Sequence, residues 1–423
     1  MSNELPGYDE AAELVAAYCA RLARLRPSSE SVGLDLAAGR VLAQPLCADR
    51  DQPPFARSTR DGYACRAREA SIHKFLRLAG SSRAGDPPAG PLPKGAAWEI
   101  MTGASVPAGA DAVMMIEHVE QAGDRLRLLP PHKIEEGENV VDQGAQARAG
   151  DELLPAGTVI HSAQIALAAA CGYTALDVFA RPRVAILTTG DELVPVALLP
   201  AAGQIRNSNA PMLAAMVEAA GGEHWVLPTA ADSAEALDAA LAQAADASLL
   251  LITGGVSAGK FDLVKPALAR AGARFHFTGV RIQPGKPLVF GELPVRNART
   301  VPEEYGTKCF FGLPGNPVSS AVTFLLFAAP VLAALAGRLE CGPRFALARL
   351  ASKTDKHGKA GLMRFLPAAC TFGGAAGQLP EVALVPMQGS GDLAALARSN
   401  CFLVVPEDAQ HFDAGAIVRI LLP

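Results

Sequence analysis

Residues 249–257 read Leu-Leu-Leu-Ile-Thr-Gly-Gly-Val-Ser, and this segment gives the clearest indication of fold class in the chain. An apolar run without alternation is typical of a strand that is buried on both faces. The two glycines that follow permit a sharp turn, and residues 261–272 then show a helical pattern. A buried strand, a glycine turn and a helix form one unit of a doubly wound parallel sheet.

The same order of elements occurs upstream. Residues 184–188 form a second apolar run, and Thr189-Gly-Asp191 is the turn after it. Asn209 is a suitable N-cap for a helix that extends to Ala220. Repetition of the unit predicts a doubly wound α/β domain over residues 181–330, with ligands bound beyond the carboxyl ends of its strands.

The rest of the chain predicts further domains, so the fold class is multidomain α/β and β. Residues 8–25 fit an amphipathic helix, and residues 31–39 fit a second helical piece. Short strands and many turns follow, and helical character returns only at residues 162–172. The predicted domains are a helical and linker domain (1–46 and 142–180), an inserted β-rich domain (47–141), the α/β domain (181–330) and a C-terminal β-barrel or sandwich (331–423).

Composition excludes several classes of protein. The 423 residues carry a formal net charge of -4, so a polybasic binder of nucleic acid or of a membrane surface is not expected. The chain does not open on a basic segment followed by an apolar run, and its most apolar stretch is interrupted by Pro330. The eight cysteines contain no Cys-x-x-Cys pair, which favours reduced thiols in a cytoplasmic protein without zinc.

Two motifs that could bind a ligand lie at the carboxyl ends of the predicted strands of the α/β domain. Gly254, Gly255 and Ser257 offer donors for an oxyanion, with a plain strand-to-helix turn as the structural alternative. Glu192 follows the neighbouring strand and Asp262 follows the glycine turn, where either carboxylate could instead cap a helix or be solvated. Because carboxylates repel a phosphate, their presence beside one would imply a bridging Mg²⁺.

Two proline-rich loops add further candidates. Lys286 and Pro287 end the run Arg281-Ile-Gln-Pro-Gly-Lys-Pro287, whose stiffness reduces the entropy that the lysine loses on meeting an anion. A Gly/Pro turn at residues 311–319 then opens an apolar helix and offers backbone donors and Ser319. A solvated or tight structural turn is the alternative for both loops.

The β-rich segment holds weaker signals. Asp61-Gly62 is a β-hairpin signal, and Thr102 lies in a second turn. Neither turn would be identified as a site from its chemistry alone.

Taken together, six motifs are far more specific than any one of them. They occur in the order Pro53-Pro-Phe with Ser58-Thr-Arg-Asp-Gly-Tyr63, Met101-Thr-Gly-Ala104 with Gly109-Ala-Asp-Ala-Val113, Thr189-Gly-Asp-Glu-Leu193, Thr253-Gly-Gly-Val-Ser257 with Asp262, Gln283-Pro-Gly-Lys-Pro287, and Gly312-Leu-Pro-Gly-Asn-Pro-Val-Ser319. In this order the chain resembles the molybdopterin molybdenumtransferase family, which includes bacterial MoeA and the E domain of gephyrin. The resemblance covers almost the whole chain and is weakest beyond Leu339.

The resemblance implies an elongated MoeA-like homodimer, with each active site between the α/β domain of one subunit and the β-rich domain of its partner. The substrates would be adenylylated molybdopterin and molybdate, with Mg²⁺ as cofactor and with AMP and molybdenum cofactor as products. A molybdopterin adenylyltransferase would be a protein partner, and neither nucleic acid nor a membrane is implied.

The resemblance also implies roles for individual residues. Glu192 and Asp262 would be catalytic and would hold the metal ion, whereas Asp61 and Thr102 would be catalytic from the partner subunit. The positions that match the family's substrate-binding motifs are Ser208, Asn209, Gly254, Gly255, Ser257, Lys286, Pro287, Gly315, Asn316, Ser319 and Ser390.

Several positions depart from the family's pattern. Gln146 stands where an aspartate is usual, Gln283 replaces a frequent lysine, and the arginines expected after Gly137-Glu-Asn139 are missing. Lys359 and Arg364 are both candidates for the cation that the C-terminal domain would supply to molybdate. These departures leave open a non-catalytic molybdopterin-binding or scaffold paralogue. A tungstate-specific insertase is also open, because molybdate and tungstate are tetrahedral dianions of nearly equal size, whereas the β-rich domains argue against an adenylyltransferase.

Overall fold

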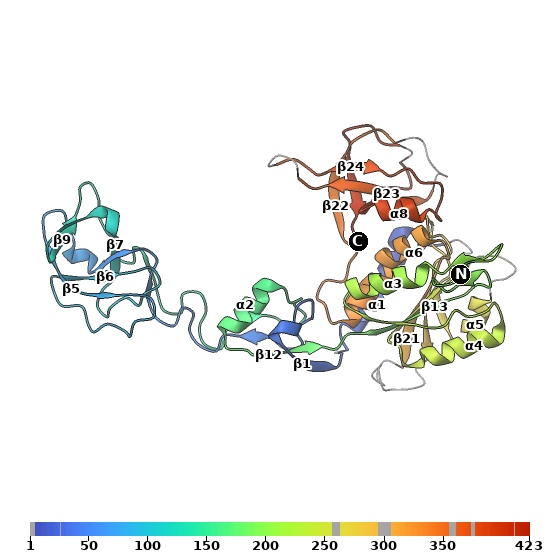
Figure 1. Cartoon of the computed structure of the whole chain (residues 1–423), viewed down its shortest axis with the longest axis horizontal. Helices are drawn as coiled ribbons and strands as arrows, with labels where there is room; N and C mark the ends of the chain where they lie inside the picture. Colours follow the sequence, from blue (N-terminus) through green and yellow to red (C-terminus); the bar gives the residue numbers. More distant parts are fainter. Residues whose placement is uncertain are drawn as a thin grey trace.

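The computed structural model describes residues 5–25, 27–255, 263–294, 306–354, 361–373, 377–409 and 411–423. The chain is elongated: a β-rich part at one end is joined through a narrow central part to a larger part that holds the α/β sheet and the C-terminal strands (Figure 1). Separate clusters of buried apolar side chains lie in the larger, central and β-rich parts.

The α/β sheet confirms the doubly wound fold expected from the sequence. It is formed by β13 (Arg183–Thr188), β16 (Glu223–Val226), β17 (Leu249–Thr253), β18 (Arg274–Phe277), β20 (Val289–Pro294) and β21 (Thr307–Leu313). The strand order is β16-β13-β17-β21-β20-β18, and the neighbours from β16 to β21 run parallel. β20 and β18 extend one edge in antiparallel pairings, which the sequence analysis does not predict.

Helices cover both faces of this sheet, which explains the unalternating apolar strands. Leu249 and Leu251 of β17 belong to one buried cluster, and Leu250 and Ile252 belong to the other. The first face is covered by α1 (Tyr8–Leu22), α3 (Asn209–Ala219), α6 (Pro317–Thr323) and α7 (Ala329–Leu335), and the second by α4 (Ala234–Gln243) and α5 (Val264–Arg270).

A π-helical turn, η6 (Phe324–Ala328), joins α6 to α7, so that Pro317–Leu335 is one helix of 19 residues. The expected interruption at Pro330 is wrong, because the chain accommodates this proline just after the π turn. By length and composition the helix could cross a membrane, yet 83% of its most apolar window is buried inside the protein. It is therefore weak evidence for a membrane location.

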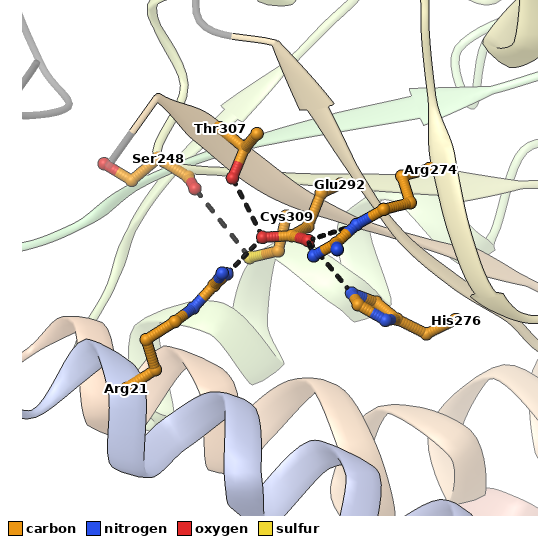
Figure 2. A network of polar contacts seen from close by, with 7 residues as sticks. All are labelled: Arg21, Ser248, Arg274, His276, Glu292, Thr307 and Cys309. Carbon is orange, nitrogen blue, oxygen red and sulfur yellow. Dashed lines mark hydrogen bonds and ion pairs between the residues drawn. The ribbon is translucent and has the colours of Figure 1, made fainter. Parts of the chain in front are cut away.

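An ionic network around the buried side chain of Glu292 links α1 to the antiparallel edge of the sheet (Figure 2). The side chain of Glu292, in β20, has no exposed surface and accepts hydrogen bonds from Arg21 of α1 and from Arg274 of β18. Thr307 Oγ1 donates at 2.8 Å, and His276 Nε2 lies 3.1 Å from the same carboxylate. Burial alone would raise the pKa of Glu292, but these hydrogen bonds outweigh it and lower that pKa to about 2.

The central part contradicts one expectation. Residues 31–39 do not form a helix: β1 (Ser29–Gly33) pairs antiparallel with β12 (Ala175–Phe179), and only a 3₁₀ turn, η1 (Leu34–Leu36), follows it. The returning helix, α2 (Ser162–Ala170), is confirmed. The same part contains β2 (Leu46–Cys47) paired with β11 (Glu152–Leu154).

The β-rich part contains a sheet with the order β7-β4-β6-β5-β9-β8. Its strands are β4 (Gly62–Cys65), β5 (Leu76–Ser82), β6 (Ala96–Ile100), β7 (Ala112–Met115), β8 (Val119–Ala122) and β9 (Arg125–Leu128). The hairpin signal at Asp61-Gly62 is wrong, because β3 (Arg57–Ser58) pairs with β10 (Val140–Val141) and not with β4. Gly62 is required for a different reason: a Cβ there would lie 1.9 Å from the Met114 carbonyl oxygen.

The C-terminal strands close into a barrel. They are β22 (Phe345–Leu350), β23 (Met363–Thr371), β24 (Glu381–Leu384), β25 (Cys401–Val405) and β26 (Ile417–Leu421), with α8 (Leu393–Arg398) beside them. β23 pairs with both β24 and β25, which closes the ring, and β19 (Ile282–Gln283) adds to β23 from the α/β segment. The barrel alternative is therefore confirmed, while the residue limits of the domains stay a prediction.

Candidate functional site

A cleft of about 960 Å³ lies beyond the carboxyl ends of the parallel strands, where barrel residues form part of its wall. The strand-end turns contribute Glu192, Gly254 and Gly315, and the barrel contributes Arg364 and Ser390. A second cavity of about 640 Å³ shares Glu192, Gly254 and Gly315 with the cleft, so the two form one connected site. The site lies where a doubly wound sheet normally binds ligands.

The glycine turn after β17 brings two strand ends into close approach. Gly254 and Gly255 have φ values of 96° and 60°, which favour glycine. A Cβ on Gly254 would lie 2.4 Å from the carbonyl oxygen of Thr189, in the turn after β13. Both the conformation and the space therefore require glycine at residue 254.

Replacement of Gly254 by alanine should destabilise the α/β domain by roughly 1–3 kcal/mol, because it combines backbone strain with a steric clash. Urea unfolding of the variant measures this loss. Gly315→Ala is the matched control, since the nearest atom to a Cβ there is 3.7 Å away and its φ is not positive. Equal stability of the two variants would contradict the close approach.

Carboxylates line one side of the cleft. Glu192 follows β13, and Asp232, which the sequence analysis missed, follows β16; both line the cleft. The backbone N–H of Asp232 donates to Asp191 Oδ1 at 3.1 Å. Burial, followed by the charge of Asp191, raises the pKa of Asp232.

The described residues contain no group of three Asp, Glu, His or Cys side chains placed to hold a metal ion. The proposed metal ligand Asp262 and the hydroxyl of Ser257 both lie outside the described residues. The oxygen donors of Glu192 and Asp232 are nevertheless the chemistry that Mg²⁺ prefers. The pairing of Glu192 with Asp262 as metal ligands stays a prediction.

Thr189 is a further residue of the site that was not predicted from the sequence. The residue is only 3% exposed, and its Oγ1 is buried without a hydrogen-bond partner among the described residues. The same atom lies 3.0 Å from the positions that a Cβ would take on Gly254 and on Gly255, so it borders the glycine turn. A buried polar atom without a partner is uncommon in folded proteins, so this hydroxyl is a candidate for a role in the site.

The side-chain amide of Asn209 links the ends of two strands at the site. Its Nδ2 donates to Thr253 Oγ1 at 3.0 Å and to the Gly315 carbonyl at 2.6 Å. The N-cap predicted at Asn209 is wrong: α3 begins at Asn209 and its N-cap is Ser208, while Asn207 Oδ1 accepts from the Ala210 N–H at 3.2 Å. The amide of Asn209 therefore holds α3 against the ends of β17 and β21.

Two basic side chains, Lys286 and Arg364, form a cationic side of the cleft. Lys286 is exposed there, whereas Arg364 is only 5% exposed and donates to the Ala409 carbonyl at 2.9 Å. Burial lowers the pKa of Arg364. Gln283 is the register partner of Arg364, so this departure from the family pattern lies in the cleft. Lys359 lies outside the described residues.

Hydroxyl groups complete the cationic side. Ser319 is buried near the start of α6, and Ser390 comes from the barrel; both line the cleft with Pro287. Asn316 Nδ2 donates to Ser390 Oγ at 2.7 Å, and the Val318 N–H donates to the Ser390 carbonyl at 3.1 Å. These bonds attach the barrel to the turn after β21.

Asp61 and Thr102 form a separate pair in the β-rich part. Asp61 Oδ1 accepts from the Thr102 N–H at 2.7 Å and from its hydroxyl at 2.8 Å, which, in that order, lower the pKa of Asp61. Figure 1 shows the β-rich part at the opposite end of the molecule from the α/β sheet and the barrel, whose residues line the cleft, so one chain does not bring Asp61 to Glu192. Gln146 is exposed and does not line the cleft. Its backbone N–H donates to the Gln52 carbonyl.

Comparison with known proteins identifies the family. Residues 7–172 match the MoeA N-terminal region (domain I and II), residues 185–334 a probable molybdopterin binding domain, and residues 348–422 the MoeA C-terminal region (domain IV). The chain belongs to the MoeA family.

Curated relatives and solved structures agree with this membership. A molybdopterin molybdenumtransferase from Nostoc sp. is 34% identical, over 93% of this chain and 88% of the relative. One from Haemophilus influenzae is 32% identical, over 93% of each. The crystal structure of a molybdopterin biosynthesis MoeA protein from Pyrococcus horikoshii OT3 is 28% identical with a TM-score of 0.79, covering 99% of this chain and 100% of that one. The resemblance and the fold class expected from the sequence are both confirmed.

This MoeA-family chain gathers most of its sequence-predicted site residues in one place. Ser208 and Asn209 line the adjoining cavity. Asp61 and Thr102 lie elsewhere, and Ser257 and Asp262 are outside the described residues. The predicted residues that line the cleft are Glu192, Gly254, Gly255, Lys286, Pro287, Gly315, Asn316, Ser319 and Ser390.

Proposed function

We propose that this chain is a molybdopterin molybdenumtransferase, which inserts molybdate into adenylylated molybdopterin and releases AMP and molybdenum cofactor. The observation that carries the proposal is one cleft with a carboxylate side, two glycine-containing turns and a cationic side. The names of the curated relatives support the same activity.

The phosphoanhydride would bind at the carboxylate side. Backbone donors at Gly254 and Gly255 and the orphan hydroxyl of Thr189 would orient its oxygens. Glu192 and Asp262 would hold a Mg²⁺ ion, which when bound neutralises charge on the anhydride oxygens.

Molybdate, a tetrahedral dianion, would bind at the cationic side. Lys286 and Arg364 would supply positive charge, and the hydroxyls of Ser319 and Ser390 would donate hydrogen bonds. Arg364 is buried in the wall of the cleft, where a charge interacts more strongly, and it is therefore the cation that we propose. This pairing would bring molybdate beside the bound pterin substrate.

The complete enzyme would be a homodimer in which Asp61 and Thr102 of one subunit reach the cleft of the other. The distance between the β-rich part and the α/β sheet in one chain supports this arrangement. A cytoplasmic location is proposed from the free cysteines, and a molybdopterin adenylyltransferase would supply the substrate. No nucleic acid or membrane partner is proposed.

The first test is AMP release by the purified protein with adenylylated molybdopterin, Mg²⁺ and increasing molybdate. Saturable, molybdate-dependent release is expected. Tight pterin binding without release would instead indicate a scaffold paralogue, for which the exposed Gln146 and the cleft residue Gln283 are the motivating departures. Consumption of ATP would indicate an adenylyltransferase, and saturation by tungstate alone would indicate a tungstate-specific insertase.

Removal of the Lys286 charge should weaken molybdate binding. We expect Lys286→Met to raise the molybdate concentration for half-maximal AMP release by about tenfold or more, since a charge-assisted contact to a dianion is lost. Lys353→Met is the control, because this lysine is exposed and does not line the cleft. An unchanged half-saturation point in Lys286→Met would remove Lys286 from the molybdate pocket.

A further inference from the structure

An exposed apolar loop borders the candidate site. Residues 195–205 follow β14 (Leu193–Val194) and lead into β15 (Ile205–Arg206), and the two strands pair in parallel. Pro200 and Ile205 line the cavity that adjoins the cleft. The large apolar side chains of the loop face solvent, with exposed fractions of 60% for Val196, 54% for Leu198, 87% for Leu199 and 57% for Ile205. Single exposed apolar residues are ordinary, whereas several in one loop mark an interaction site, and we call this loop the apolar ledge.

Hydrogen bonds order the backbone of the apolar ledge. Arg206 Nε donates to the carbonyl oxygens of Val196 at 3.0 Å and of Leu198 at 3.1 Å. The Gln204 N–H donates to the Ala201 carbonyl at 3.0 Å, and Gln204 Oε1 accepts from the Ala201 N–H at 3.1 Å. The exposed side chains are therefore presented by a pre-organised loop, which loses little entropy when it docks.

A second exposed apolar surface lies near Asp61 in the β-rich part. It consists of Phe55 and Ile116, whose exposed fractions are 40% and 46%, and we call it the apolar tip. The Ile116 N–H donates to the Asp61 carbonyl at 3.1 Å. Phe55 lies just before β3, whose Ser58 carbonyl accepts from the Gly103 N–H at 2.8 Å in the turn after β6. The tip is thus built around the Asp61 end of the β-rich part.

The apolar ledge has the same relation to Glu192 that the apolar tip has to Asp61. The Ile205 N–H donates to the Glu192 carbonyl at 2.8 Å, so an exposed isoleucine is bonded through its backbone to each of these acidic residues. One chain cannot bring ledge and tip together, because the β-rich part lies at the opposite end of the molecule from the α/β sheet (Figure 1). Two copies of the chain can.

We propose that the apolar ledge of one copy of the chain docks on the apolar tip of a second copy and closes the shared site against water. This inference rests on the proposed function, since it takes Glu192 and Asp61 as parts of one site. Docking removes apolar side chains of both copies from water, which stabilises the contact. It also excludes water from the site, where charges then interact more strongly.

The test is photo-crosslinking from the ledge in the full-length chain. Leu199→Cys is coupled to a benzophenone maleimide, and because Leu199 is 87% exposed this change should not disturb the fold. Isotope-labelled and unlabelled chains are mixed and allowed to exchange before irradiation. We expect capture of peptides that contain Phe55 or Ile116, with about half of these crosslinks joining a labelled to an unlabelled chain.

Two controls accompany this experiment. Leu339→Cys is the matched variant, because Leu339 is 67% exposed but follows α7 and lines neither the cleft nor the adjoining cavity. Its crosslinks should not reach Phe55 or Ile116. The unaltered chain gives the background, since its eight free cysteines are all buried or half-buried.

A charge on the apolar ledge should also lower activity. Leu199→Asp should reduce AMP release by about tenfold or more, because docking would take its carboxylate out of water. Leu199→Met, which keeps the apolar character, should lose little. Full activity of Leu199→Asp would overturn the docking.

The crosslinks decide the proposal in three ways. It is overturned if residue 199 captures Phe55 or Ile116 only within one copy, if it captures other regions or nothing at all, or if Leu339→Cys captures the same peptides equally well. Crosslinking needs no substrate, so docking and activity fail separately. AMP release without the expected crosslink would overturn the docking alone, and the crosslink without AMP release would support the docking and overturn the proposed activity.

Discussion

Asp61→Asn and Glu192→Gln proteins, each inactive alone, should recover activity when their subunits are mixed and allowed to exchange. Each variant should lose AMP release by about a hundredfold or more, since each would remove a catalytic carboxylate. A mixed dimer has one site in which both Glu192 and Asp61 are unaltered and one site in which both are substituted. Random pairing of subunits therefore predicts about a quarter of the wild-type activity.

Both substitutions should leave the fold intact, because the two carboxylates are exposed. The measurement is AMP release against the mixing ratio, with Asp61→Asn mixed with Thr102→Ala as the control. These two residues lie in the same β-rich part, so every site in this mixture lacks one of them and the mixture should stay inactive. If the Asp61→Asn and Glu192→Gln mixture stays inactive after exchange, a site shared between subunits is wrong.

Glu292→Gln should lower the free energy of unfolding by roughly 2–4 kcal/mol. The carboxylate, which has no exposed surface, accepts from Arg21 and Thr307 through Oε1 and from Arg274 through Oε2. A glutamine replaces one of these oxygens with an NH₂ group. This group would face hydrogen-bond donors, and it cannot accept a hydrogen bond from them. The depression of the pKa from 4.5 to about 2 corresponds to a stabilisation of about 3 kcal/mol, which agrees with this range.

The same variant should change the pH dependence of stability. A carboxyl with a lowered pKa stabilises the fold fully above its usual value of 4.5, and this contribution is lost as the pH falls through about 2. The difference between wild type and Glu292→Gln should therefore shrink below pH 4.5. Glu120→Gln is the control, because its ion pair with Arg127 is 37–42% exposed and should contribute less than about 1 kcal/mol. Equal losses in the two variants at neutral pH would contradict the network's role.

The strand-end turns of the site could be predicted because their signals are local. An unalternating apolar run followed by Gly254 and Gly255 shows both the strand and the turn. Asp232 gives no such signal, since a lone acidic residue in a loop is usually solvated. It reaches the cleft only because Ala230 pairs with Thr189 beyond the end of β13. The hydroxyl of Thr189 is a candidate site group only because it is buried without a partner among the described residues, and the sequence does not show burial.

Parts of the fold could not be predicted because they depend on contacts between residues that are far apart in the sequence. Residues 29–33 gain strand conformation from pairing with β12, more than a hundred positions later, and this long-range contact overrides the local helical pattern. Glu292 is an acidic residue in an apolar strand, yet its donors come from α1, β18 and β21. The sequence could suggest that it needs partners but not which ones.

The long apolar helix at Pro317–Leu335 also has a consequence for synthesis of the chain. As it leaves the ribosome, this segment has the length and composition of a membrane anchor. The strands of the α/β sheet, α1 and α3 all precede it in the chain, and the helix buries its side chains against them. Its docking surface has therefore been synthesised before the segment emerges, and N-terminal parts of a chain fold first. The order of elements thus limits the time during which the nascent helix is open to membrane insertion or aggregation.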